Sequence, residues 1–252
     1  MKQDERPPFD RALRRAREAA YAPGEYVGQE SFMSAGEIRA LAERAGVGPG
    51  VAMLDLCCGV AGPGSYLVRE LGCDYLGVDS SASAVAIARA RARELRFEVG
   101  RVPPLPPGTV DVVLLLEAML AFEEKEALVR GIAGALPPGG RFAFTLEAGA
   151  PLTPAERAAM PDADTVWLTP FEELATTLER AGLVLTWQAD HSRAHAATAA
   201  AIAAAFAADA DAIAVQIGRR GLDDLLAAHA LWSEWLGEGR VRKLALVAER
   251  VA

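Results

Sequence analysis

The stretch VAMLDLCCGVAGPG, residues 51–64, decides the fold. An apolar run closes around Asp55, glycines follow, and a helical pattern begins at about 64–71. In a parallel α/β sheet, ligands bind beyond the carboxyl ends of the strands, and glycines there let the backbone approach a ligand closely. Three chemistries could use this loop: thiol or metal chemistry at Cys57 and Cys58, backbone binding of a phosphate, or docking of a nucleoside-bearing cofactor.

The remainder of the chain continues the alternation of strands and helices. Apolar runs predict strands at about 51–56, 73–79, 96–100, 109–120, 141–148, 183–190 and 242–250. Helical periodicity is found at about 9–20, 35–45, 64–71, 82–95, 123–135 and 170–181, and nearly fifty helical residues precede the last strand. Such alternation predicts a mostly parallel sheet covered by helices on both faces.

Composition limits the class of protein and its partners. The chain has 252 residues, 52% of them apolar, which suits one large α/β domain. A net charge of −8 argues against a nucleic-acid partner, because binding a phosphate backbone needs clustered positive charge. No long run of bulky apolar residues predicts a membrane span, and residues 1–15 lack the apolar core of a signal peptide. We therefore expect a cytoplasmic protein.

The three cysteines, at 57, 58 and 73, fit a reduced compartment better than a disulfide scaffold. No Cys-x2-Cys pair or nearby histidine completes a set of zinc ligands, so no metal is expected. A nucleophilic Cys57 or Cys58 would need a partner base, and buried packing is the favoured interpretation of both.

Two carboxylates distinguish between possible ligands of the loop. Pro63 removes an N–H where a pyrophosphate would need a donor, and Asp55 would repel a pyrophosphate but attract an ammonium group. Asp79, at the end of the second strand and about 20 residues beyond the glycines, can accept hydrogen bonds from both hydroxyls of a ribose. A ligand with an amino-acid end and a ribose is S-adenosylmethionine.

Four segments in this order resemble the successive motifs of class I S-adenosylmethionine-dependent methyltransferases: LDLCCGVAGPG, LGVDSS, VDVVLLLEAML and LPPGGRFAFT, within residues 50–150. The resemblance implies a Rossmann-like, seven-stranded, mostly parallel sheet. The segment YVGQESFMSAGE, residues 26–37, also resembles the N-terminal cofactor cover of small-molecule methyltransferases. The long helical insertion before the last strand is typical of members that act on small or natural-product substrates.

The resemblance also implies roles for single residues. It places Asp55, Cys57 and Gly59 around the methionine end of the cofactor, Asp79 on the ribose and Glu117 beneath the cofactor. The remaining predicted cofactor contacts are Ser80, Gly100, Arg101 and Val102 around the adenine, with Tyr26, Phe32 and Ser34 in the cover. The chain departs from the family pattern where Cys57 and Ala61 replace the first and third loop glycines, and where Arg101 replaces an acid. Arg101 cannot accept a hydrogen bond from the adenine amino group.

Methyl transfer from a sulfonium needs alignment and, for some acceptors, a base. Glu147 and His191, at the ends of the fifth and sixth strands, are the predicted catalytic residues, and Asp190 could orient His191. His195 lies four residues beyond His191. His229 falls on an apolar stripe and is expected to be a packing residue, with pocket lining as the alternative.

We therefore expect a methyltransferase that acts on a small molecule, on N or O rather than C. Its expected parts are a helical cover (1–48), a cofactor-binding core (49–190 and 241–252) and a helical lid (191–240) that could also form a homodimer contact. One alternative is a cofactor-binding protein that does not methylate, with a regulatory or a different catalytic role. Pro63 and Asp55 argue against a nicotinamide-dependent oxidoreductase, because both disfavour a pyrophosphate in the loop. The negative net charge argues against a nucleic-acid methyltransferase.

Overall fold

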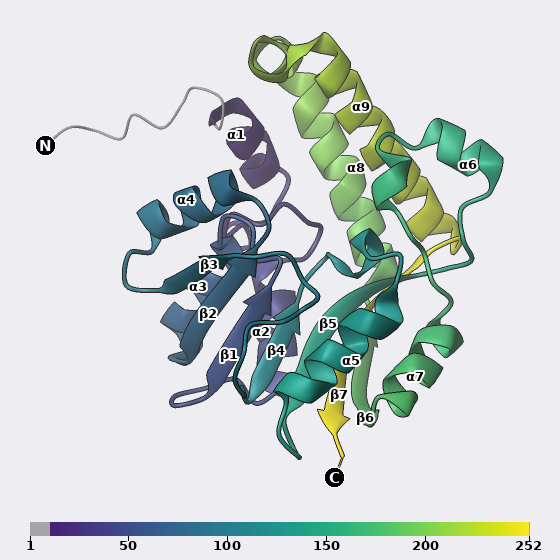
Figure 1. Cartoon of the computed structure of the whole chain (residues 1–252). Helices are drawn as coiled ribbons and strands as arrows, with labels where there is room; N and C mark the ends of the chain where they lie inside the picture. Colours follow the sequence, from purple (N-terminus) through teal and green to yellow (C-terminus); the bar gives the residue numbers. More distant parts are fainter. Residues whose placement is uncertain (1–10, 252) are drawn as a thin grey trace, which may run out of the picture.

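The computed structural model describes residues 11–251 and is built on one seven-stranded sheet (Figure 1). Its strands are β1 (Ala52–Leu56), β2 (Asp74–Asp79), β3 (Arg96–Val99), β4 (Val112–Leu115), β5 (Arg141–Ala148), β6 (Leu183–Asp190) and β7 (Arg242–Arg250). They lie in the order β3-β2-β1-β4-β5-β7-β6, and β7 runs antiparallel to both of its neighbours. The predicted fold class, a Rossmann-like and mostly parallel sheet, is confirmed.

Helices cover both faces of the sheet. One face packs against α2 (Ala35–Arg44), α3 (Gly62–Leu71) and α4 (Ala82–Arg91), and the other against α5 (Lys125–Ala135) and α7 (Phe171–Arg180). The central strand β4 shows why its sequence is continuously apolar. Val112 and Leu114 join the core on the first face, while Val113 and Leu115 join the core on the second. Each such buried side chain contributes about 1.5–3 kcal/mol of transfer free energy.

The order of the strands reverses between β1 and β4. From β1 the chain proceeds outward to β2 and β3, and from β4 it proceeds the other way to β5. The connections that leave β1 and β4 therefore diverge to opposite faces and open a crevice at the carboxyl ends of these two strands. The glycine loop follows β1 there, and Leu116–Ala118 follows β4.

The insertion before β7 forms a helical hairpin of α8 (Ser192–Ala208) and α9 (Ala210–Glu238). Because β6 and β5 are both antiparallel to β7, α8 begins at the same edge of the sheet as the crevice. In Figure 1 the hairpin stands above that edge, with α1 (Arg11–Ala19) beside it. Ala12 and Ala16 of α1 pack with Phe206 of α8 and with residues of α9. Gly218, at φ 82°, bends α9.

None of the helices in residues 11–251 is by itself long and apolar enough to cross a membrane. The pair α8 and α9 meets that test only when taken together, and the two helices are bent by 99° at their junction.

One local feature differs from the sequence predictions. The Pro-rich segment after β5 contains a short helix, α6 (Pro154–Ala159). Thr153 and Glu156 form a capping box there, and Pro154 at the first turn lacks only an N–H that the helix would leave unpaired. The predicted first helix begins at residue 9, and its first two positions lie outside the described residues.

Candidate functional site

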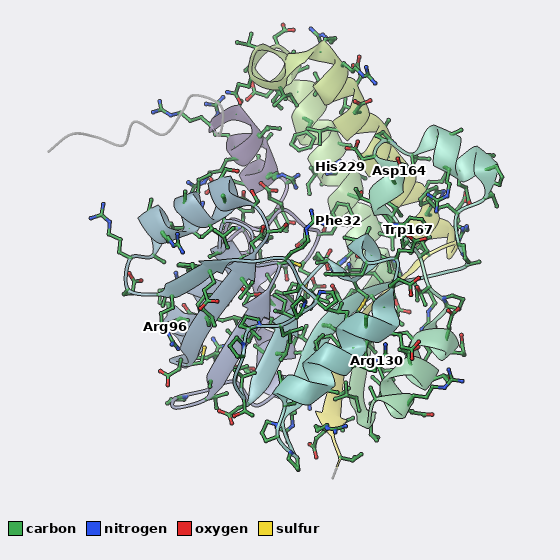
Figure 2. All side chains as sticks on the ribbon, viewed as in Figure 1. Phe32, Arg96, Arg130, Asp164, Trp167 and His229 are labelled. Carbon is green, nitrogen blue, oxygen red and sulfur yellow. The ribbon has the colours of Figure 1, made fainter. Side chains whose placement is uncertain are left out.

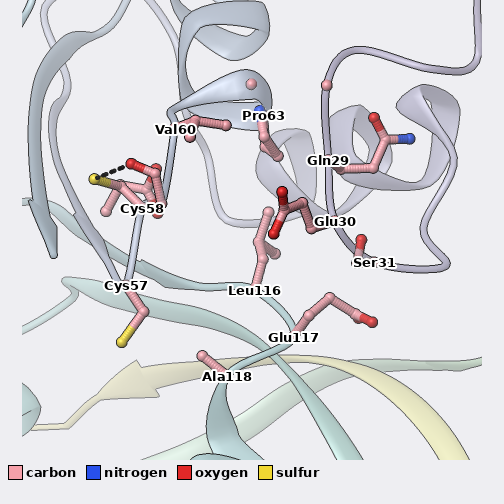
Figure 3. Close-up of a pocket in the computed structure, with 14 residues that line it drawn as sticks. Gln29, Glu30, Ser31, Cys57, Cys58, Val60, Pro63, Leu116, Glu117 and Ala118 are labelled. Atoms are coloured by element: carbon pink, nitrogen blue, oxygen red, sulfur yellow. Dashed lines mark hydrogen bonds between the residues drawn. The ribbon is translucent and has the colours of Figure 1, made fainter. Parts of the chain in front are cut away.

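A cavity opens in the crevice between β1 and β4 (Figure 3). Three segments line it: the N-terminal loop Gly28–Ser31, the glycine loop after β1, and Leu116–Ala118 after β4. Figure 3 shows Glu30 and Ser31 on the opposite side of the cavity from Val60, while the amide of Gln29 points away from the cavity. We call this space the first cavity.

The glycine loop keeps a left-handed backbone at three alternate positions. Cys57 and Ala61 both have φ 58°, and Gly59 between them has φ 53°. Glycine adopts this region freely, whereas an L residue pays about 1–2 kcal/mol there. Two of these three positions therefore carry a side chain in a conformation that favours glycine.

Asp79 ties the end of β2 to that loop. Its Oδ2 accepts a hydrogen bond from the N–H of Gly59 at 2.9 Å, and its Oδ1 accepts one from the N–H of Ser81 at 2.8 Å. The N–H of Gly100 donates to the backbone carbonyl of Asp79. The carboxylate is thus held in one orientation, half-buried, and each oxygen keeps a lone pair for a further donor.

The predicted adenine contacts lie beside Asp79 at the ends of β2 and β3. Ser80 and Arg101 are exposed, and Val102 packs against the core of the second face. Their contacts with a cofactor stay predictions, as does the ribose contact of Asp79.

Asp55 is buried at the end of β1 and lines the first cavity. The hydroxyl of Tyr75 donates to its Oδ2 at 2.7 Å. Burial raises the pKa of Asp55 to about 7, against the opposing effect of the Tyr75 hydrogen bond. Sequence analysis did not identify Tyr75, because its position on β2 looks like ordinary strand core.

The thiols of the loop are held in their protonated form. Burial, reinforced by the carboxylates of Asp79 and Asp55, raises the pKa of Cys57 to about 12 and also raises the pKa of Cys58. Because the thiolate is the reactive form, this environment disfavours thiol chemistry.

The N-terminal loop is organised by Gln29, which is 2% exposed. Its amide oxygen accepts from the N–H of Val27, and its amide nitrogen donates to the carbonyls of Glu25 and Met33. These bonds fix the loop over the first cavity and present Glu30 and Ser31 to it. Sequence analysis missed these three residues, since a single glutamine in a loop carries no positional signal.

The residues predicted in the cover have other surroundings. Tyr26 packs against Tyr21, with ring centroids 5.6 Å apart, and Phe32 lines a second cavity described below. Ser34 is the N-cap of α2, and its hydroxyl accepts from the N–H of Glu37. The residues that border the first cavity are instead Gly28–Ser31, between Tyr26 and Phe32.

Replacing Gly62 with alanine is expected to push the N-terminal loop away from the first cavity. A Cβ at Gly62 would lie 2.6 Å from the backbone of Val27 and Gly28, which is too close to be accommodated without movement. We expect at least about a tenfold loss of affinity for S-adenosylhomocysteine, measured by calorimetric titration. Gly48→Ala is the matched control, because no atom lies within 4 Å of its Cβ position. If the two variants bound S-adenosylhomocysteine with equal affinity, the close contact of Gly62 with the N-terminal loop would not matter for cofactor binding.

A second cavity adjoins the first and lies under the helical hairpin. The two share Glu30, Ser31 and Glu117 on their linings. The second is also lined by Arg17, Phe32, Leu120, Glu147, Ala228, His229, Trp232, Leu236 and Lys243. Figure 2 shows Phe32 and His229 near each other between the sheet edge and α9, with ring centroids 5.7 Å apart.

A buried cluster of three charges closes the bottom of the second cavity. Lys243 of β7 is 1% exposed and forms ion pairs with Glu147, its cross-strand neighbour on β5, and with Glu117 at 2.6 Å. Burial favours the neutral amine, but the two carboxylates outweigh it and raise the pKa of Lys243. Sequence analysis singled out both glutamates but not Lys243, whose only signal is a charge inside an apolar strand.

The predicted orientation of His191 by Asp190 is wrong. Asp190 accepts hydrogen bonds from Ser192 and Arg242, whereas His191 Nδ1 pairs with Glu37 at 2.9 Å. Glu37 is held by the capping box of α2, and this pairing raises the pKa of His191. His191 is not among the residues that line the second cavity, so a catalytic role for it stays a prediction.

The other two histidines also have identified partners. His195, which is buried, pairs through Nε2 with the second oxygen of Glu37 at 3.0 Å. His229 has Nδ1 2.7 Å from the carbonyl of Leu225, and burial lowers its pKa to about 4. His229 packs against Phe32, as expected for a packing residue, and it also lines the second cavity, as the alternative interpretation predicted.

Comparison with known proteins supports a methyltransferase. Residues 54–144 match the sequence profile of a methyltransferase domain. Phosphoethanolamine N-methyltransferase 3 of Arabidopsis thaliana is 30% identical over 134 residues, which are 50% of this chain and 27% of that protein. Norajmaline N-methyltransferase of Rauvolfia serpentina is 29% identical over 44% of this chain and 40% of that protein. The matched residues thus span less than half of the length of each of these two curated relatives.

Solved structures share the whole fold at low sequence identity. A cyclopropane synthase from Mycobacterium tuberculosis has a TM-score of 0.81 and 16% identity, covering 98% of this chain and 95% of that chain. The cyclase SpnF has a TM-score of 0.76 and 20% identity, covering 97% of this chain and 94% of that chain. These likenesses extend the match from the central domain to the N-terminal helices and the helical hairpin.

Proposed function

The chain belongs to the class I S-adenosylmethionine-dependent methyltransferase family, and from this premise we propose that it methylates a small molecule held in the second cavity. The cofactor would lie in the first cavity with Asp55 near its amino-acid end and the glycine loop alongside. Its ribose would reach past Gly59 to Asp79, which bonds Gly59 but does not line the cavity. When bound, the cofactor supplies an activated methyl group.

The observation that carries the proposal is the junction of the two cavities. Glu30, Ser31 and Glu117 line both of them, so a donor in one and an acceptor in the other would meet at these residues. The N-terminal loop lines both cavities and α9 lines the second, so these segments would orient a donor and an acceptor for in-line attack.

The residues of the first cavity fit such a cofactor. A buried carboxylate, Asp55, faces the cavity without a cationic partner among the contacts described for it, which suits an ammonium group. Gly62 leaves no room for a side chain against the N-terminal loop, so the backbone forms the wall there. The relatives include N-methyltransferases of phosphoethanolamine and norajmaline and also sterol 24-C-methyltransferases, so the proposal of an N or O acceptor rests on the residues of the second cavity.

Thermal melts with S-adenosylmethionine, S-adenosylhomocysteine and NAD test the cofactor. The two adenosyl ligands are expected to stabilise the protein and NAD is not. Stabilisation by NAD alone would favour an oxidoreductase. Formation of S-adenosylhomocysteine in the presence of a panel of small acceptors then tests the transfer.

A second candidate function is a catalyst that binds the cofactor without transferring its methyl group. The likeness to the cyclase SpnF over nearly the whole chain favours keeping this alternative. Such a catalyst would bind S-adenosylhomocysteine but would not consume S-adenosylmethionine, whereas a methyltransferase converts S-adenosylmethionine into S-adenosylhomocysteine.

The affinity for S-adenosylhomocysteine is expected to rise with pH. Because the pKa of Asp55 is raised to about 7, folded protein retains a proton below that pH, and a nearby ammonium favours its release. Calorimetric titration should give a dissociation constant about tenfold lower at pH 8 than at pH 6. For the protein alone the same shift stabilises the folded state at acid pH, and this contribution is lost as pH rises through about 7.

Asp55→Asn provides the control for that pH dependence. The amide has no charge to titrate, so its affinity should be weak and nearly constant over the same range. A wild-type affinity that does not change with pH would exclude Asp55 as the partner of the ammonium group.

A further inference from the structure

We propose that the second cavity takes an amine carried on an apolar or aromatic body, and that Glu147 binds the nitrogen and receives its proton. This inference rests on the proposed function and names the class of acceptor for the same site.

Glu147 offers an unused buried acceptor. The residue is 6% exposed, its Oε1 accepts from Lys243, and its Oε2 has no hydrogen-bond partner among the described residues. Buried carboxylate oxygens are normally paired, because leaving one unpaired costs its full desolvation free energy. Since Glu147 lines the second cavity, a donor on the acceptor molecule would satisfy this oxygen.

The charges around the cavity favour a cation or a neutral donor over an anion. Its lining carries three carboxylates and two cations, a net charge of −1, from Glu30, Glu117, Glu147, Arg17 and Lys243. A second buried lysine, Lys125, also interacts with the charge of Glu147. Its ammonium donates to the carbonyls of Phe122 and Trp167, and it does not line the cavity. An anionic acceptor would therefore meet uncompensated negative charge.

The walls of the cavity fit an apolar body. Phe32, Leu120, Trp232 and Leu236 lie on its lining together with the charged cluster. Aromatic faces also attract an ammonium group, particularly when water is excluded. The cavity thus offers apolar side chains for a ring or chain and carboxylates for a nitrogen.

The position of Glu147 is fixed by the sheet. It lies directly opposite Lys243 in the β5–β7 register, and Lys243 bonds Glu117 on its other side. The lysine cation lies between the two carboxylates and offsets their mutual repulsion.

The chemistry balances with these groups alone. An acceptor bound as an ammonium would first pass one proton to the carboxylate of Glu147, which frees the lone pair of its nitrogen. That lone pair would form the new N–C bond, and the electron pair of the broken S–C bond would stay on sulfur and neutralise it. The proton would later leave Glu147 for solvent.

Binding of three matched probes tests the inference without relying on turnover. Protein saturated with S-adenosylhomocysteine is titrated with 2-phenylethylamine, 2-phenylethanol and phenylacetate. We expect the amine to bind about tenfold more tightly than the alcohol, as for a charge-assisted hydrogen bond, and the acid to bind most weakly. In Glu147→Gln the advantage of the amine over the alcohol should disappear.

Glu249→Gln is the matched control. Glu249 also faces a cation across β5 and β7, namely Arg141, but at the opposite end of the same strand pair and partly exposed. This variant should keep the preference for the amine. Stabilisation by S-adenosylhomocysteine shows that each variant is folded, and its absence from the wild type would refute the proposed function itself.

Three results would overturn the inference while leaving the proposed function intact. The first is that the alcohol or the acid binds the wild type as tightly as the amine or more tightly. The second is that none of the three probes binds. The third is that folded Glu147→Gln keeps the preference for the amine.

Discussion

Asp79→Ala is expected to abolish the stabilisation that S-adenosylhomocysteine gives to the wild-type protein. At a ligand concentration about 100 times its dissociation constant, binding stabilises the wild type by about 2.7 kcal/mol. For a chain of this size that is a rise in melting temperature of about 5–10 °C. The variant loses the proposed partner of both ribose hydroxyls, and it also loses the anchor that accepts from the N–H of Gly59 at 2.9 Å. Melting curves with and without ligand measure both losses together.

Two further variants separate the effects of Asp79. Asp74→Ala removes an exposed carboxylate from the other end of β2 and should keep the full ligand-induced rise. Asp79→Asn keeps one acceptor oxygen but lacks the charge, so it should retain part of the rise. If Asp79→Ala were stabilised by the ligand as much as Asp74→Ala, Asp79 would not bind the cofactor.

Lys243→Met is expected to be the most destabilising of the substitutions considered. It removes the cation between Glu117 and Glu147 and leaves both carboxylates in a site where Lys243 itself is 1% exposed. Breaking a buried pair in this way costs about 3–5 kcal/mol, because the remaining charge is desolvated and unpaired. The melting temperature should fall by about 10 °C or more in a thermal melt without ligand.

The neighbouring residue on β7 gives a control for this substitution. Arg242 pairs with Asp190 on the surface, where both side chains are about half exposed, so Arg242→Met should cost no more than about 1 kcal/mol. Adding Glu147→Gln to Lys243→Met should restore part of the lost stability, because it removes one of the two unpaired charges. Equal losses for Lys243→Met and Arg242→Met would show that the buried cluster contributes little to stability.

Local sequence patterns sufficed for the elements and for the cofactor loop. The continuous apolar run that became β4 has to be buried on both faces, and the turns around it carry their own glycines and prolines. Ser34 and Glu37 form a capping box at the start of α2, and this signal lies within four consecutive residues. Such signals depend on neighbours within a few residues, so they can be interpreted without a tertiary structure.

Contacts between distant segments could not be predicted from adjacency in the sequence. Asp190 and His191 are adjacent in sequence, yet His191 pairs with Glu37, which is more than 150 residues away. The second oxygen of the same carboxylate pairs with His195. Adjacent side chains at a strand end point in different directions, and the partner of each is decided by which helix packs there.

By itself, the sequence determined a mostly parallel α/β sheet, the loop that follows β1 and the carboxylates Asp55 and Asp79 at the ends of two neighbouring strands. Each of these follows from hydrophobic period, turn chemistry and the rule that ligands bind at the carboxyl ends of parallel strands. Only the tertiary structure decided that Gln29 fixes the loop over the cofactor cavity and that Lys243 joins Glu117 to Glu147 beneath a second one. The physical reason is that β7 returns antiparallel between β5 and β6, which brings a lysine from the end of the chain opposite a glutamate 96 residues earlier.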